Sequence, residues 1–424
     1  MKKKLETKMS RRSFLKGAVA GAALLGGPGI PYIARNAAAE PPPIKVAIVD
    51  ALSGAYSRNG NLGIQGTKAL MGWYNDRGGI KSLGGAKFVP VIADNKSTVE
   101  GSANAMERLC RDPDILIAQP TWGSSFAMAA TEVTERLGIP SFTTGFSEKL
   151  NQRGFKYGFY PYPGFLDDMR LGVPVVMDMF KSTGREIKTQ FVTSSNNISD
   201  LVFCQQTQKF LEEKGIKTLG TEFWPIGTLT DASTIMQKIK RENPDIVIYG
   251  GSAVSEMQLF LMKQKELRMK NSIFLGSSGF LGDPTVKFGG EYLDSWLALT
   301  PSFYHKRTPP EWHKRILDQC RKEYSDEPWA GQELGFPWCL VPVYAEALER
   351  AGSRDRKVIR DTIAKLDIQG TMTASCFVKN AVAFEPTGRL ATKYCGIMVI
   401  QWQKGTCYCI YPPDIAMAKP RLVF

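Results

Sequence analysis

Residues 44–52 have the sequence IKVAIVDAL, an almost unbroken run of apolar residues that ends at a loop rich in serine, glycine and asparagine. A strand that is buried on both faces has this pattern, because neither face needs polar side chains. A helical pattern follows over residues 60–75, where apolar side chains recur at Leu62, Ala69 and Trp73. A buried strand followed by an amphipathic helix is the repeating unit of parallel α/β sheets.

Strand and helix patterns then alternate along two successive regions. The first region has predicted strands at 87–93, 114–118 and 139–143, and predicted helices at 97–110 and 124–137. The second region has predicted helices at 166–180, 199–213, 231–242 and 252–267, and predicted strands at 187–193, 218–223, 245–249 and 272–275. Residues 305–366 are mostly helical in pattern, and residues 376–411 are rich in strands, with Gly388 in a turn.

This alternation predicts the fold class α/β, with two doubly wound parallel-sheet lobes in series. The junction between the two regions lies near residues 160–163, where two prolines occur in the sequence YPYP. Proline is disfavoured in the interiors of helices and sheets, so this segment suits a hinge strand. We therefore expect a hinge of several strands to join the two lobes.

The composition excludes several classes of protein. The 424 residues are 43% hydrophobic and 22% charged, which is typical of a soluble globular chain and not of a disordered, collagen-like or coiled-coil protein. No run of 18 apolar residues occurs after residue 40, which argues against a polytopic membrane protein. The net charge is +13, but residues 1–39 carry +7 of it. The remainder is only mildly basic, so we expect no nucleic-acid partner.

The first 39 residues resemble an export signal. A basic start is followed by a mildly apolar run over residues 17–27, and the small residues Ala37, Ala38 and Ala39 precede Glu40. Within this segment, residues 10–16 read SRRSFLK, which resembles the twin-arginine signal. Such signals export folded proteins, so we expect a periplasmic protein. The sequence leaves open whether the signal is cleaved or retained as an anchor.

Cysteine and histidine give no sign of a reactive or metal-binding centre. Eight cysteines allow disulfides, but the sequence does not define their pairing. Cys407 and Cys409 could form half of a metal site on a strand, but no second pair with ligand spacing accompanies them. The only histidines, His305 and His313, suggest no catalytic triad, and no G-x-S-x-G motif occurs. We therefore expect neither a cofactor nor an enzyme.

Several short sequences occur in the order and spacing of one known family. They are IKVAIVDALSGAYSRNG at 44–60, NDRGGI at 75–80, LGIP at 137–140, LNQRGF at 150–155, NPD at 243–245 leading into IYGG at 248–251, and QWQKG at 401–405. Together they make the chain resemble the type I periplasmic solute-binding proteins of ABC transporters. The resemblance is to the branch that binds leucine, isoleucine and valine, and it covers nearly all of residues 44–421.

The resemblance implies two lobes, residues 44–161 with 303–395 and residues 162–302 with 396–424, which close over a solute. It implies a monomer that delivers this solute to a membrane permease, while a separate partner hydrolyses ATP. The absence of a G-x-x-x-x-G-K-[ST] loop agrees with that division. A ligand-sensing domain for a membrane receptor or regulator would share the same fold, and the sequence does not separate the two functions.

The resemblance also implies which residues hold the solute. In the first lobe they are Trp122, Gly123, Ser124 and Ser125 after the third strand, and Gly145, Phe146 and Ser147 after the fourth. In the second lobe they are Asn197, Ser252 and Ser278. Hydroxyl groups and free backbone N–H groups at a helix N-terminus favour an anion. The loops of the first lobe are therefore expected to hold a carboxylate or an amide oxygen.

The residue at position 278 bears on the identity of the solute. Amino-acid-binding members of the family place an acid there, which pairs with the ammonium group of the solute, whereas this chain has Ser278. A buried ammonium group needs a compensating charge. Asp200 and Glu256 are expected to face solvent on helices. The sequence therefore favours an aromatic acid, a short organic acid or a urea-like amide, and a branched-chain amino acid remains the alternative.

Overall fold

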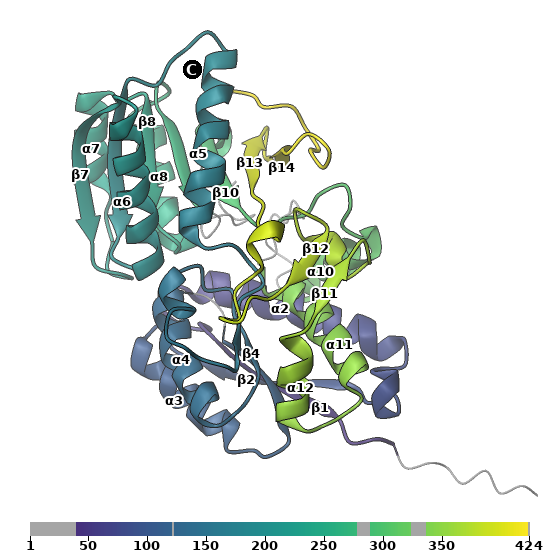
Figure 1. Cartoon of the computed structure of the whole chain (residues 1–424). Helices are drawn as coiled ribbons and strands as arrows, with labels where there is room; N and C mark the ends of the chain where they lie inside the picture. Colours follow the sequence, from purple (N-terminus) through teal and green to yellow (C-terminus); the bar gives the residue numbers. More distant parts are fainter. Residues whose placement is uncertain (1–39, 121–122, 278–288, 324–335, 423–424) are drawn as a thin grey trace, which may run out of the picture. The chain divides into compact units, whose positions relative to one another are not determined.

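The computed structural model describes residues 40–120, 123–277, 289–323 and 336–422. The predicted signal segment, residues 1–39, lies outside the described residues. From Pro41 onward the chain forms one compact unit. This unit contains two lobes, each built on its own mainly parallel sheet (Figure 1).

The first lobe contains a parallel sheet of five strands in the order β2-β1-β3-β4-β5. The strands are β1 (Ile44–Asp50), β2 (Phe88–Asp94), β3 (Ile115–Pro120), β4 (Ser141–Phe142) and β5 (Gly158–Phe159). The helices that follow the strands are α2 (Ser57–Asp76), α3 (Val99–Cys110) and α4 (Ser124–Arg136). Strand β1 lies between β2 and β3, with Val46 opposite Pro90 on one side and Ile117 on the other. This interior position explains its almost unbroken apolar sequence.

The second lobe contains seven strands in the order β14-β13-β10-β9-β8-β6-β7. The strands are β6 (Thr189–Ser195), β7 (Lys217–Trp224), β8 (Ile246–Gly250), β9 (Ile273–Ser277), β10 (Trp296–Thr300), β13 (Met398–Gln403) and β14 (Thr406–Tyr411). The helices are α5 (Phe165–Ser182), α6 (Ile198–Glu213), α7 (Ser233–Glu242) and α8 (Val254–Glu266). Strands β6 to β10 are parallel and repeat the order of the first sheet, and β13 and β14 extend the sheet antiparallel beside β10.

The segment after β10 packs on the first lobe. It contains α10 (Pro310–Glu323), α11 (Leu340–Ala351), α12 (Arg356–Ile363) and the small antiparallel sheet of β11 (Asp367–Gln369) and β12 (Ala381–Ala383). Helices α10 and α11 contact α2, and α12 contacts α11. The chain therefore crosses between the lobes after β5, after β10 and before β13. Short 3₁₀ helices are η1 (Lys81–Leu83), η2 (Glu148–Leu150), η5 (Gly290–Ser295), η6 (Phe336–Cys339), η7 (Ala374–Cys376) and η8 (Thr392–Tyr394).

Helices cover both faces of each sheet, because neighbouring strand residues are buried in different apolar clusters on opposite faces. In β1, Val46 packs in a cluster with residues of α2 and α11, whereas Ala47 packs with residues of α3 and α4. In β6, Val192 packs with α5 and α6, whereas Phe191 packs with α7 and α8. Both sheets are thus doubly wound, and each reverses its winding between its first and third strands. Ligands of α/β proteins bind at this reversal, beyond the carboxyl ends of the strands.

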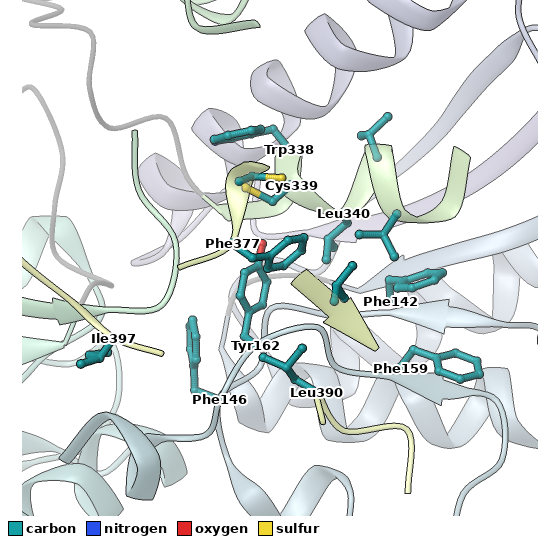
Figure 2. Close-up of a cluster of buried hydrophobic side chains, with 14 of the residues drawn as sticks. Phe142, Phe146, Phe159, Tyr162, Trp338, Cys339, Leu340, Phe377, Leu390 and Ile397 are labelled. Carbon is teal, nitrogen blue, oxygen red and sulfur yellow. The ribbon is translucent and has the colours of Figure 1, made fainter. Parts of the chain in front are cut away.

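One apolar core extends through both lobes. Where the chain first crosses, Tyr162 lies between Phe146 and Phe377, with ring centroids 5.9 and 6.0 Å apart (Figure 2). Phe146 also stacks on Phe165 at 5.1 Å, and Phe165 contacts Phe203 of α6 at 5.6 Å. The loop after β4 therefore rests on a packed aromatic layer that reaches the second lobe.

The predicted fold class is confirmed, and the differences are local. The helix predicted from residue 60 begins at Ser57, and β5 ends just before the predicted hinge segment 160–163. Gly388 lies in the predicted turn, with a φ of 77° and its N–H donating to the Glu385 carbonyl at 2.8 Å. All eight cysteines are buried. In the described chain no cluster of metal-ligating side chains occurs, and no helix is long and apolar enough to cross a membrane.

Candidate functional site

The loops after β3 and β4 meet at the N-terminus of α4. Gly123 is the N-cap of this helix with a φ of 83°, and a Cβ there would lie 2.7 Å from the ring of Phe126, so glycine is required. Ser124 is 2% exposed, and its Oγ accepts the backbone N–H groups of Phe146 at 3.1 Å and Ser147 at 3.2 Å. Two accepted bonds use both lone pairs of a hydroxyl, so the Ser124 O–H is left to donate.

In the second lobe the loops after β6 and β8 meet at Asp200. This carboxylate is completely buried. Its Oδ2 accepts bonds from Ser195 Oγ at 2.9 Å, Asn197 Nδ2 at 3.2 Å and the Ser252 backbone N–H at 3.1 Å. Its Oδ1 accepts a bond from the Ser252 hydroxyl. Asp200 thus fixes Asn197 and Ser252, two of the three second-lobe residues that the sequence assigned to the site.

A small polar pocket lies where these loops meet. Its described lining residues are Gly123, Ser124, Thr144, Phe146, Phe165, Asn197, Ser199 and Ser252. The polar ones follow the carboxyl ends of β3, β4, β6 and β8, the position that doubly wound sheets use for ligands. The cavity volume is about 10 Å³, which holds about one water molecule. A larger solute therefore requires the lobes to separate.

Hydrogen bonds connect the two lobes around this pocket. Ser125 Oγ donates to Asn197 Oδ1 at 3.3 Å. Asn59 Nδ2 donates to the Ser252 carbonyl at 3.0 Å, and Asn59 Oδ1 accepts the Val254 N–H at 3.3 Å. All of these partners lie at strand carboxyl ends or in the first turns of helices. The bonds join the rims of the pocket and break if the lobes separate.

Buried aromatic contact adds to these hydrogen bonds. Tyr56 is completely buried and meets Phe126 edge to face, with ring centroids 5.5 Å apart. Ala253 of the second lobe belongs to the same apolar cluster. Tyr56 also approaches the buried acids of the second lobe, since the charges of Asp200 and Glu256 contribute to a raised pKa of its hydroxyl, after the larger effect of burial.

The expectation that Asp200 and Glu256 face solvent is wrong. Asp200 is 0% exposed and Glu256 is 1% exposed. Burial raises the pKa of Asp200, and hydrogen bonds from Ser252, Ser195 and Asn197 oppose that rise. Burial, together with the nearby charge of Asp200, raises the pKa of Glu256 to about 7. Asp200 therefore lies in hydrogen-bond contact with two lining residues of the pocket, Asn197 and Ser252, although it is not a lining residue itself.

The structure brings many of the sequence-assigned residues together. Those that line the pocket are Gly123, Ser124, Phe146, Asn197 and Ser252. Ser125 reaches Asn197 across the lobes, whereas Gly145 and Ser147 are buried in the same loop as Phe146 without being lining residues. Trp122 and Ser278 lie outside the described residues.

Sequence reasoning missed three lining residues, Thr144, Phe165 and Ser199. Thr144 belongs to the loop after β4, and in the described chain its buried Oγ1 has no hydrogen-bond partner. Its neighbours Gly145, Phe146 and Ser147 were assigned to the site, so a hydroxyl at this position could have been included. Nothing in the local sequence distinguishes Phe165 from an ordinary core residue.

A larger hollow of about 490 Å³ lies elsewhere on the second lobe, beside η5 and the turn between β13 and β14. Its charged side chains largely pair with one another. Lys270 lies 3.0 Å from Glu291, and Arg421 lies 3.7 Å from Asp294. The hollow draws its described lining from one lobe, and it lies away from the carboxyl ends of the parallel strands. The interlobe pocket is therefore the better candidate site.

Two doubly wound lobes, three chain crossings and a polar pocket between strand carboxyl ends define the class of periplasmic solute-binding proteins. Residues 43–406 match the family model described as periplasmic binding protein. The chain therefore belongs to the periplasmic binding protein family.

Particular relatives agree with this assignment. A Leu/Ile/Val-binding protein homolog 7 from Brucella suis is 23% identical over 393 residues, covering 89% of this chain and 94% of the relative. A leucine-binding protein structure from Thermotoga maritima has a TM-score of 0.69 at 19% identity, covering 88% of this chain and 99% of that one. A fatty acid ABC transporter substrate-binding protein from Thermomonospora curvata has a TM-score of 0.70 at 15% identity, covering 90% and 96%. At these identities the structures show a shared fold.

Proposed function

We propose that this protein is the solute-binding subunit of an ABC importer and carries a small organic solute to a membrane permease as a monomer. The observation that supports this most directly is the pocket between the lobes, lined by polar groups at strand carboxyl ends of both sheets. The relatives named above are described as binding proteins for branched-chain amino acids or fatty acids. No step of catalysis is part of the proposal.

In this proposal the first lobe holds a carboxylate or amide oxygen of the solute. The Ser124 O–H and the N-terminus of α4 supply hydrogen-bond donors and the positive end of a helix dipole. Ser125, Gly145 and Ser147 complete this side, and Trp122 covers the solute. Asn197, Ser252 and Ser278 close on it from the second lobe.

The lobe boundaries are part of the same proposal. Residues 44–161 with 303–395 form one lobe, and residues 162–302 with 396–424 form the other. The support is the sheet membership of β1–β5 and of β6–β10 with β13 and β14, together with the packing of α10 and α11 on α2. Opening would then occur about the three crossing segments, as in hinged binding proteins.

A thermal-shift screen of residues 40–424 tests the proposed function. The panel contains branched-chain amino acids, aromatic acids, dicarboxylates, fatty acids and amides. A ligand at 100 times its dissociation constant stabilises the folded protein by about 2.7 kcal/mol, so a true solute is expected to raise the unfolding midpoint clearly. Calorimetry then measures each hit. A panel without any hit would argue against a small organic solute.

We propose that the protein reaches the periplasm by the twin-arginine route, on the strength of SRRSFLK at residues 10–16. Replacing Arg11 and Arg12 together with lysine keeps the charge and removes the paired guanidinium groups. The expected result is that the variant accumulates in the cytoplasm, as measured by fractionation and immunoblotting. The control replaces Lys3 and Lys4 with arginine and should still be exported. Normal export of the Arg11→Lys/Arg12→Lys variant would contradict the route.

A further inference from the structure

The hydrogen bonds around Asp200 have directions that chemistry fixes. Three donors converge on Asp200 Oδ2, which favours the ionised carboxylate. An ionised carboxylate only accepts hydrogen bonds. The Asn197 amide must therefore turn its Nδ2 toward Asp200 and toward Ser199 Oγ at 3.0 Å. The Ser252 hydroxyl must likewise use its single proton on Asp200. Both side chains line the pocket. Their N–H and O–H protons are already used in these hydrogen bonds and are not available to a solute.

What these two side chains can offer a solute is therefore limited to oxygen lone pairs. Asn197 Oδ1 faces the first lobe, where it accepts from Ser125 Oγ at 3.3 Å. The lone pairs of Ser252 Oγ are the part of its hydroxyl that stays available. Ser199, the third polar lining residue of this lobe, accepts from Asn197 and keeps a hydroxyl that can rotate. The first lobe offers a donor instead, through the Ser124 O–H.

We propose that Asp200 is a positioning residue that makes Asn197 and Ser252 hydrogen-bond acceptors on the second-lobe side of the pocket. The solute must then present a donor, either a hydroxyl, an amide N–H or an ammonium group, to Asn197 and Ser252. This inference rests on the proposed function, because it assumes that the interlobe pocket is the solute site. The sequence favoured a solute without an ammonium group. The proposal instead requires a solute with a hydrogen-bond donor, and that donor can be an ammonium group.

The replacement Asp200→Asn tests whether the solute needs a donor. It keeps the side-chain volume nearly constant and reverses the direction of one hydrogen bond, the one between residue 200 and Ser252 Oγ. Three fixed donors converge on the Oδ2 position, namely the Ser195 hydroxyl, Asn197 Nδ2 and the Ser252 N–H. The amide oxygen of the new side chain belongs there, and its NH₂ group then faces Ser252 Oγ. Ser252 becomes an acceptor of that bond, and its own proton turns toward the pocket. A merely structural Asp200 would leave selectivity unchanged.

The first measurement uses matched probes that differ in one group. They are the 2-amino, 2-hydroxy and 2-oxo forms of 4-methylpentanoate and of phenylacetate, with affinities from calorimetry at neutral pH. In the wild type the tighter of the amino and hydroxy forms should bind at least about tenfold more tightly than the oxo form. Asp200→Asn should reduce this ratio about tenfold. Asp178→Asn, an exposed site on α5 with the same change of charge, should keep the wild-type ratio.

Two results of this measurement would overturn the proposal. One is a wild type that binds the oxo form as tightly as the donor-bearing forms. The other is a cooperatively folding Asp200→Asn variant with an unchanged ratio. If none of the six probes binds, the result counts against the organic-acid solute of the proposed function. The role of Asp200 is then decided by a second measurement that needs no ligand.

The second measurement is a double-mutant cycle on stability between positions 197 and 200. Asn197→Asp places a carboxylate where an amide donor faced Asp200, so it should lower the unfolding midpoint markedly in the wild-type background. In the Asp200→Asn background the same change removes no charge-assisted bond and creates no pair of like charges, so its effect should be much smaller. Equal losses in both backgrounds would show that Asp200 does not orient Asn197.

Discussion

Replacing Ser124 with alanine is expected to lower the free energy of unfolding by about 2–4 kcal/mol. Ser124 Oγ accepts the backbone N–H groups of Phe146 and Ser147 in a place that is 2% exposed. Alanine leaves both donors buried without a partner, and each such group costs about 1–3 kcal/mol. Urea denaturation with an unchanged m-value measures the loss.

Ser125→Ala is the matched control for this prediction, because Ser125 is half-buried and its one described bond, to Asn197, lies at the pocket rim. Its stability should change by roughly 0.5 kcal/mol or less. Both replacements together should weaken solute binding by roughly 1–3 kcal/mol if both hydroxyls bind the solute. An equal loss of stability in the two single variants would contradict the role given to Ser124, and unchanged affinity of the double variant would reject the site.

Replacing Glu256 with glutamine is expected to stabilise the protein above pH 7 and to flatten its stability between pH 5 and pH 8. The pKa of Glu256 is about 7 in the folded protein, because of burial and the nearby charge of Asp200, against 4.5 for the free side chain. The folded state thus holds a proton that the unfolded state releases between these two values. Stability must then fall as pH rises through this window, by on the order of 3 kcal/mol for this group.

The measurement is the free energy of unfolding at pH 5, 6, 7 and 8 for the wild type and Glu256→Gln. Glutamine keeps the shape of the side chain without the charge, so the two curves should agree near pH 5 and diverge toward pH 8. Glu213→Gln on the exposed face of α6 serves as a control and should follow the wild type. Parallel curves for the wild type and Glu256→Gln would show that Glu256 does not carry this pH dependence.

The fold could be predicted because its signals are local. An apolar run such as residues 44–50 marks a strand buried on both faces, and the strands and helices alternate without interruption. The loops of the candidate site could be located for the same reason, since parallel strands bring their carboxyl ends to one edge. Gly123 and Ser124 were assigned from the family resemblance, and the structure places them after β3 at the start of α4.

Burial of Asp200 and Glu256 could not be predicted, because it depends on contacts between distant segments. Asp200 lies in the first turn of α6, where an acid usually stabilises an exposed helix end. Its partner Ser252 is far away in sequence and reaches it only because β6 and β8 are neighbours in the sheet. A single sequence contains the helix periodicity but not this pairing.

The late strand β13 has a consequence for how the chain is made. Strand β10 is parallel to β9 on one side, and its other edge is covered only by β13, which comes near the end of the chain. During synthesis this edge stays unpaired after the rest of the second sheet can form, and open strand edges recruit other chains. A ribosome that stops before residue 398 would therefore release a product prone to aggregate.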